Sequence, residues 1–212
     1  MKRTIFLPIL LLFFVFLSVK GQDMSALFTA MPDEYVPYLE SAWRKDLVEL
    51  YSSGKQASLK NTLNGTSALL KLTDDYLLLQ SSERSTIEMK LLPLINNTYI
   101  ICVVTTVNGP VPDSRIAFFT TEWKPLKAEN LITLVSGDWF IKADTDRTTD
   151  AYKDAVSQLD MELIQYRLNP DNLTLTATYM TPQYLGREER EKVTPYLKET
   201  PKLFTWENSR FN

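Results

Sequence analysis

The chain has 212 residues, no histidine, one cysteine and six glycines, and its formal net charge at pH 7 is −3. The absence of histidine excludes serine–histidine and cysteine–histidine nucleophilic catalysis and most zinc sites, and no glycine motif for a dinucleotide or a phosphate is present. The basic residues are scattered along an acidic chain, so the composition indicates no nucleic-acid partner, no cofactor and no metal.

The first 21 residues have the pattern of a secretory signal peptide. The basic pair Lys2 and Arg3 precedes the uncharged apolar run Ile5–Val19, and the small residue Gly21 stands just before a cleavage site at Gln22. A membrane-spanning helix needs about 20 apolar residues, so the shorter run favours cleavage over a retained anchor. We therefore expect no stable membrane span after cleavage, and a protein that is periplasmic or extracellular.

Removal of residues 1–21 leaves 191 residues, which is enough for one hydrophobic core without disulfides. It removes three basic residues and no acidic residue, so the net charge changes from −3 to −6. We expect a single α+β domain over residues 22–212, and a division into two lobes, 22–126 and 127–212, is the alternative. The lone Cys102 lies in an apolar run and is predicted to be buried and unreactive.

The first element after the signal is predicted to be a helix that packs on a sheet. Leu39, Trp43, Leu47 and Leu50 recur at spacings of three and four residues, which is one face of a helix. Gly54 is a suitable residue just beyond its C-terminal end.

Five strands with short connections are predicted next. The connections contain Asp, Asn, Gly and Pro at short intervals, which favours hairpins and an antiparallel sheet. Asn96 and Asn97 form the clearest hairpin signal, a two-residue loop, because asparagine tolerates positive φ. The predicted strands are residues 69–73, 76–82, 86–94, 98–107 and 114–123.

The strand 98–107 is apolar on both faces. Ile101 and Val103 point one way, whereas Ile100, Cys102 and Val104 point the other. Such a strand belongs in the interior of a sheet that is covered on both sides. The predicted helix is one cover, and the second is either another part of this chain or a partner.

Two charged residues interrupt the apolar pattern of the strand 86–94. Glu88 and Lys90 alternate with Ile87, Met89 and Leu91, which predicts that the charged pair lies on a wetter face. A cross-strand ion pair explains them without chemistry.

The second half alternates helices and strands. Thr148 and Thr149 precede a predicted short helix from Asp150, and a charged helix from Arg187 is interrupted near Pro195. Strands are predicted for residues 161–168, 173–180 and 202–207, whereas residues 130–142 have no clear pattern.

Three segments resemble one known family. They are AMPDEYVPYL from Ala30 to Leu39, LTDDYLLLQSSERSTIEMKLLPL from Leu72 to Leu94, and FFTTEWKPL from Phe118 to Leu126. They are similar to the Bacteroidales family catalogued as domain of unknown function 3256. The resemblance covers most of the first half and implies a Gram-negative envelope protein with no known activity. It transfers no functional residue to this chain.

The sequence offers few candidate site residues. Asp74 and Asp75 are adjacent acids in a turn, where turn formation explains them better than a catalytic carboxylate pair, and no catalytic residue is assigned. Trp123 is a candidate for a binding platform, with core packing as its simpler explanation. The acids around Asp146 have the odd spacing of a calcium loop but lack its glycine and its final glutamate, so no metal site is assigned.

These observations favour an exported, non-catalytic binding or interaction protein of the envelope, with a protein or a glycan as its partner. One alternative is a glycan hydrolase that uses carboxylates only. Another is a homodimeric scaffold or assembly factor that pairs through an uncovered sheet face. The sequence leans against an enzyme.

Overall fold

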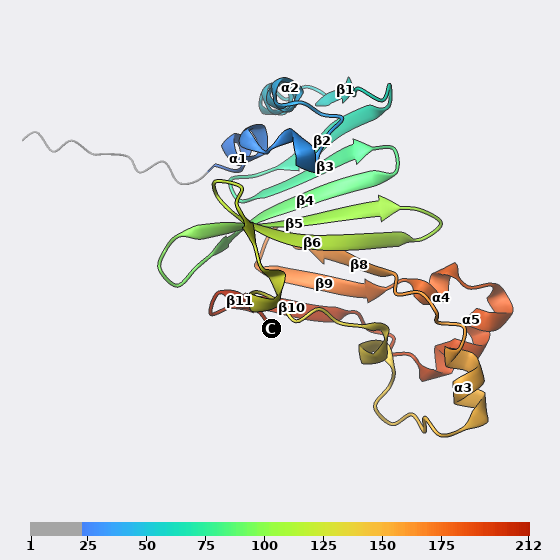
Figure 1. Cartoon of the computed structure of the whole chain (residues 1–212). Coiled ribbons are helices and arrows are strands. Elements are labelled where there is room, and N and C mark those ends of the chain that lie inside the picture. Colours follow the sequence, from blue (N-terminus) through green and yellow to red (C-terminus); the bar gives the residue numbers. More distant parts are fainter. Residues whose placement is uncertain (1–22) are drawn as a thin grey trace, which may run out of the picture.

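The computed structural model describes residues 23–212, so the predicted signal peptide, residues 1–21, lies outside the described residues. The described chain is α+β, as expected, with two antiparallel sheets and several short helices. Figure 1 shows the larger sheet with two helices on one side and the smaller sheet against its other side. Within residues 23–212 no helix is both long and apolar enough to cross a membrane.

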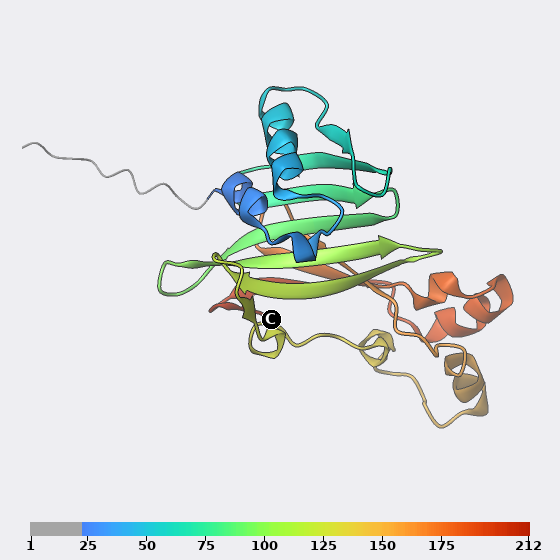
Figure 2. The ribbon, with the colours of Figure 1, turned by 45° about the horizontal axis from the view of Figure 1, so that its top comes forward.

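The N-terminal layer consists of α1 (Met24–Ala30), the 3-10 turn η1 (Asp33–Tyr35) and α2 (Ser41–Ser52). The predicted helix is α2, and Gly54 with φ of +70° follows its C-terminal end as expected. Helix α1 was not predicted from the sequence, and the side chain of Asp23 caps its N-terminus. Figure 2 shows both helices on the same face of the large sheet.

The large sheet is a meander in which every strand pairs with its neighbours in the sequence. All five predicted strands are present, and β1 and β7 at the two ends are short additions that the pattern did not indicate. The strands are β1 (Ser58–Lys60), β2 (Thr66–Leu72), β3 (Tyr76–Ser82), β4 (Ser85–Pro93), β5 (Tyr99–Asn108), β6 (Pro112–Thr120) and β7 (Pro125–Leu126).

The turn between β4 and β5 differs from the predicted two-residue loop. The Leu94 N–H donates to the Thr98 carbonyl oxygen at 2.8 Å, so three residues lie between them. Only Asn97 has positive φ, at 61°, and the Asn96 side chain instead accepts the Thr98 N–H at 3.1 Å. A three-residue loop that ends in one left-handed residue explains the asparagine pair.

Strand β5 is covered on both faces, as its sequence predicted. Ile101 and Val103 pack in a core beneath α1 and α2. Ile100, Cys102 and Val104 pack in a second core, which contains residues of the second half of this chain. The second cover is therefore the chain itself. Burial raises the pKa of the Cys102 thiol well above its ordinary value.

The second half builds a four-stranded antiparallel sheet in the order β11-β10-β9-β8. The predicted helix start at Asp150 is correct, with Thr149 as its N-cap, and the charged helix ends before Pro195 as expected. The elements are η2 (Ala128–Asn130), η3 (Gly137–Phe140), α3 (Asp150–Val156), β8 (Ile164–Leu168), β9 (Thr174–Tyr179), α4 (Thr181–Tyr184), α5 (Arg187–Val193), η4 (Thr194–Tyr196), β10 (Lys202–Glu207) and β11 (Arg210–Phe211).

The two sheets are joined by side chains that complete the edge of β8. The N–H groups of Ile164, Tyr166 and Leu168 point away from β9. They donate to Asp113 Oδ1 at 3.0 Å, Ser114 Oγ at 3.1 Å and Glu88 Oε2 at 2.8 Å, respectively. The large sheet thus supplies side-chain acceptors where a further strand would supply carbonyl groups. An exposed strand edge is thereby closed without a strand.

The prediction that Glu88 and Lys90 lie on a wetter face is wrong. Both side chains are buried on the face that the second sheet covers, with 7% and 2% exposure. They do not pair with each other: Lys90 Nζ lies 2.7 Å from Asp75 Oδ2 and donates to the Pro170 carbonyl oxygen at 2.9 Å. The alternation along the strand is as predicted, but the packing of a segment 80 residues downstream determines which face is buried.

Candidate functional site

An apolar groove lies at the edge of β6. Its volume is about 410 Å³. Arg115 and Ile116 both line it, although adjacent residues of a strand point to opposite faces. One cavity reaches both faces of a strand only where it wraps around a sheet edge, and we call it the edge groove. Its other lining residues are Met31, Tyr35, Ile87, Val103, Thr105, Ala117, Phe118, Phe119, Trp123, Pro125, Leu126 and Ala128.

The sequence candidate Trp123 lies in the wall of the edge groove and also in the core. Its φ of 62° is unusual for a residue other than glycine. The backbone turn directs the indole inward, where it packs against Tyr35 and Phe119 at centroid distances of 5.9 and 5.3 Å. Its Nε1–H donates to the Leu27 carbonyl oxygen at 3.1 Å. Trp123 therefore attaches α1 to the sheet and shapes one wall of the groove.

The backbone of β6 is paired on one side only along most of its length. Strand β7 pairs with Phe118 and Phe119 alone. The Thr120 N–H donates toward β7, to the Lys124 carbonyl oxygen at 2.9 Å. Because main-chain direction alternates along a strand, the N–H and carbonyl groups of Ile116 point to the same side, where β7 does not reach. A short stretch of open strand edge therefore borders the groove.

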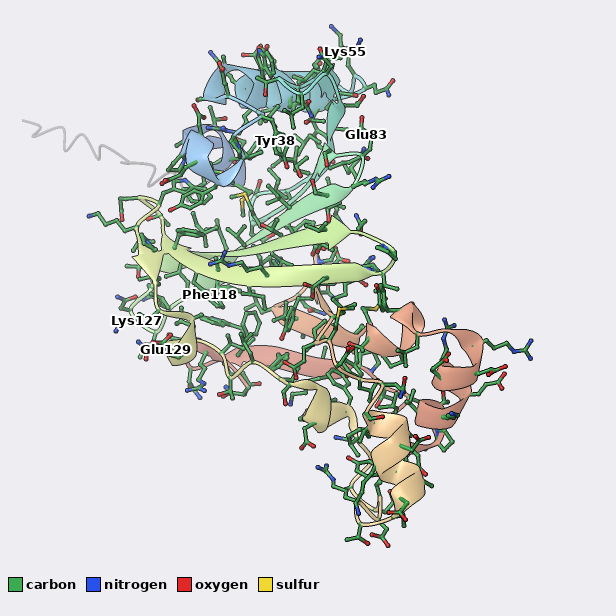
Figure 3. The ribbon with its side chains drawn as sticks, turned by 45° about the vertical axis from the view of Figure 1, so that its right-hand side comes forward. Tyr38, Lys55, Glu83, Phe118, Lys127 and Glu129 are labelled. Atoms are coloured by element: carbon green, nitrogen blue, oxygen red, sulfur yellow. The ribbon has the colours of Figure 1, made fainter. Side chains whose placement is uncertain are left out.

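Arg115 is the charged residue in the lining of the edge groove, and Lys124 and Lys127 are next to lining residues in the sequence, as are Glu122 and Glu129. Arg115, Lys124 and Lys127 are exposed, and no acidic side chain of residues 23–212 lies within ion-pair distance of them. Glu129 follows on η2. Figure 3 places Phe118 between β6 and the second sheet, with Lys127 and Glu129 on the segment beyond β7.

The candidates Asp74 and Asp75 lie at the other side of the large sheet, away from the edge groove. Asp74 is exposed, and its carbonyl oxygen accepts the Met24 N–H at 3.1 Å. Asp75 accepts the Thr73 hydroxyl at 3.1 Å and forms the ion pair with Lys90. The two aspartates thus have different partners, and neither lines a described pocket together with the other.

A second, polar cleft lies in the corner between the two sheets. Its volume is about 460 Å³. The buried face of the large sheet supplies Glu88 and Thr106, and the outward face of the second sheet supplies Gln165 and Arg167. We call it the corner cleft. Its other lining residues are Tyr76, Leu78, Thr86, Asn108, Leu168, Asn169, Pro170 and Thr176.

Of the residues that the structure describes, Glu88 is the one carboxylate that lines the corner cleft. Burial raises the pKa of its carboxyl, although the Leu168 N–H, the Arg167 charge and the Tyr76 hydroxyl oppose that rise. Burial beside Glu88 also raises the pKa of the Tyr76 phenol. The sequence predicted no site here, because only the packing of β8 brings Arg167 close to Glu88.

The aspartates of the calcium-like pattern serve the local chain. Asp146 Oδ1 accepts the Thr148 N–H at 2.9 Å and the Thr148 hydroxyl at 2.6 Å. These bonds form a turn just before α3. Among residues 23–212 no group of three or more potential ligand side chains is arranged to hold a metal.

Comparisons with known proteins support the resemblance seen in the sequence. The model of the family described as "Protein of unknown function (DUF3256)" matches residues 16–211. A solved structure, described as a domain of an uncharacterized protein from Porphyromonas gingivalis W83, is 32% identical with a TM-score of 0.81. The alignment covers 89% of this chain and 98% of that one. No curated protein matches the chain.

Proposed function

We propose a function from the premise that this chain belongs to the DUF3256 family: it is an exported, non-catalytic binding protein of the bacterial envelope. Its partner is a protein, of which an extended segment lies in the edge groove along β6. The observation that carries the proposal is the coincidence of an apolar cavity with an open strand edge, because Arg115 and Ile116 line the same groove.

Strand addition accounts for both features of the edge groove. An extended peptide beside β6 would pair with the N–H and carbonyl groups of Ile116. Alternate side chains of the peptide would enter the apolar groove from opposite faces of β6. Arg115 in the lining, which has no ion-pair partner among residues 23–212, favours an acidic residue in the peptide.

The two alternatives have less support. A glycan hydrolase needs two carboxylates about 5–9.5 Å apart, whereas the corner cleft has Glu88 alone and Asp75 is paired with Lys90. The homodimer was inferred from an uncovered sheet face, and β8–β11 of the same chain cover that face.

Export is the second part of the proposal and has its own test. The apolar run and small-residue pattern of residues 1–21 support it. Mass spectrometry of protein recovered from the native envelope should give a chain that starts at or close to Gln22. A mass that includes residues 1–21, in protein found in the membrane pellet, would contradict cleavage.

Site-specific photo-cross-linking in cells tests the edge groove. A photoreactive amino acid in place of Thr105, which lines the groove and is exposed, should capture one partner. Adding Ala117→Arg should abolish capture, because the arginine side chain fills the groove; Ala117 also packs against the core, so the variant is used only if its melting temperature matches that of the parent. The same photoreactive group at Leu203, which is 56% exposed on the other sheet, is the matched control.

Three outcomes would count against the proposed function. The first is capture from Leu203 equal to that from Thr105. The second is capture that persists in Ala117→Arg. The third is a product formed only between two copies of this chain, which would favour the homodimer instead.

A further inference from the structure

The corner cleft is a second site, and it is independent of the edge groove. Its floor is the part of the large sheet that β8 leaves uncovered, with Thr86 on β4 and Thr106 on β5. Its wall is the outward face of the second sheet, with Gln165 and Arg167 on β8 and Thr176 on β9. Two elements from distant parts of the sequence therefore face each other across the cleft.

The polar side chains of the corner cleft retain unused hydrogen-bonding capacity. Among residues 23–212 no side-chain hydrogen bond engages Thr86, Gln165, Arg167 or Thr176. Asn169 uses its Oδ1 to accept the Asp171 N–H at 2.8 Å and the Asn172 N–H at 3.2 Å, and its Nδ2 group has no partner among residues 23–212. This differs from Arg44 and Lys90, whose donors are occupied by the protein.

The charges of the corner cleft limit the class of ligand. A simple anion would meet Glu88 at the floor, and a simple cation would meet Arg167 on the wall. The remaining groups are amides and hydroxyls, and these both donate and accept. A ligand with several neutral groups that each donate and accept fits such a lining best. Sugar hydroxyls have this property.

We propose that the corner cleft binds a saccharide, with Gln165 and Arg167 on one side of the sugar and Glu88 and Thr86 on the other. Arg167 donates to ring or hydroxyl oxygens, and Glu88 accepts from a hydroxyl group. Tyr76 lies beside Glu88 in the lining but is only 4% exposed, so it shapes the cleft from beneath. The volume of about 460 Å³ is within the range of small-molecule sites.

The test measures binding of defined sugars to the purified protein by protein-observed NMR. The probes are glucose, galactose, mannose, N-acetylglucosamine and their disaccharides, with citrate as the anionic probe and spermidine as the cationic probe. At least one saccharide should shift the amide signals of β8 and β4 in a saturable manner. Citrate and spermidine should not.

Variants identify the site. Gln165→Ala and Arg167→Met each remove a group from the wall and should weaken saccharide binding about tenfold. Arg187→Met is the matched control, since Arg187 is exposed on α5 and pairs with Glu191 at 2.8 Å. It should leave the affinity unchanged, and all three variants should keep the melting temperature of the parent.

The inference is overturned by any of three results. One is that no saccharide of the panel shifts β8 and β4. Another is that Gln165→Ala and Arg167→Met bind as tightly as the parent. The last is that citrate binds in place of sugars, which would make the cleft an anion site. None of these results bears on the edge groove, so the proposed function stands or falls separately.

Discussion

The carboxylate of Glu88 on β4 accepts the main-chain N–H of Leu168 on β8 at 2.8 Å, across 80 positions of the sequence. A side chain thus occupies the place of a neighbouring strand. With Asp113 and Ser114, it closes the edge of β8 and fixes how the second sheet is seated on the first. The same carboxylate forms the floor of the corner cleft, so one residue connects the fold to the candidate sugar site.

Glu88→Ala should destabilise the protein by about 1–3 kcal/mol, because it leaves the buried Leu168 N–H without an acceptor. Glu88→Gln retains an acceptor oxygen at the same position and should be closer to the parent. Urea unfolding of the three proteins gives the comparison. Equal stability of Glu88→Ala and the parent would show that the bond to Leu168 is dispensable.

The stability contributed by Glu88 should depend on pH. Burial raises the pKa of its carboxyl in the folded state above the ordinary value of 4.5. The contribution is therefore fully present below that ordinary value and is lost as pH rises through the folded-state pKa. Relative to Glu88→Gln, which does not titrate, the parent should lose unfolding free energy over the pH range above the ordinary value of 4.5. A constant difference across that range would contradict the raised pKa.

Arg44 should be the most sensitive residue of the N-terminal layer. It is fully buried, and it donates to the carbonyl oxygens of Phe28 at 3.0 Å and Leu39 at 2.6 Å, and to that of Met31. Arg44→Met removes the guanidinium donor from all three carbonyl groups and should cost at least about 3 kcal/mol by urea unfolding.

Its ion-pair partner provides the control. Asp33 lies 2.9 Å from Arg44 Nη1, but its side chain is 57% exposed. Asp33→Asn should change the free energy of unfolding by less than about 1 kcal/mol. If Arg44→Met proved as mild as Asp33→Asn, the guanidinium would not be what attaches α1 to α2.

Strand β5 provides a matched pair of substitutions. Val103→Asp places an unpaired charge in the core beneath α1 and should cost several kcal/mol, enough to unfold many single domains. Val107→Asp puts the same residue at a position of the strand that is 57% exposed and should be tolerated. Melting temperatures compare the two, and similar values would show that the end and the middle of β5 are equally buried.

Asp74 and Asp75 should contribute unequally to the stability of the protein. Asp75→Asn removes the partner of the buried Lys90 ammonium, 2.7 Å away, and should destabilise by about 2 kcal/mol. Asp74→Asn should change the free energy of unfolding by less than about 0.5 kcal/mol, because Asp74 is exposed.

The same two variants test for catalysis. We expect no hydrolysis of polysaccharides or peptidoglycan fragments by the parent protein. Turnover by the parent that disappears in either folded variant would revive the carboxylate enzyme.

Much of the first half was predictable because its signals are local. The strands 76–82 and 98–107 were found within one residue of their ends, since alternation and turn residues act within a few positions. The ends of the sheet were missed because β1 and β7 have three and two residues, too few for a pattern. Of the residues that line the two candidate sites, only Trp123 was predicted from the sequence. The contacts of Glu88 with Leu168 and Arg167 were not predicted, because those residues lie far from Glu88 in the sequence and no local pattern connects them.

The sequence by itself determined the α+β class, the antiparallel order of hairpins, the burial of Cys102 and the family. These depend on neighbours within a few residues or on a motif. Only the tertiary structure decided which segment covers the second face of β5 and that Glu88 and Lys90 are buried. It also decided where the edge groove and the corner cleft lie. Each of those depends on contacts between distant segments, such as Glu88 with Leu168, and such contacts leave no period in the sequence.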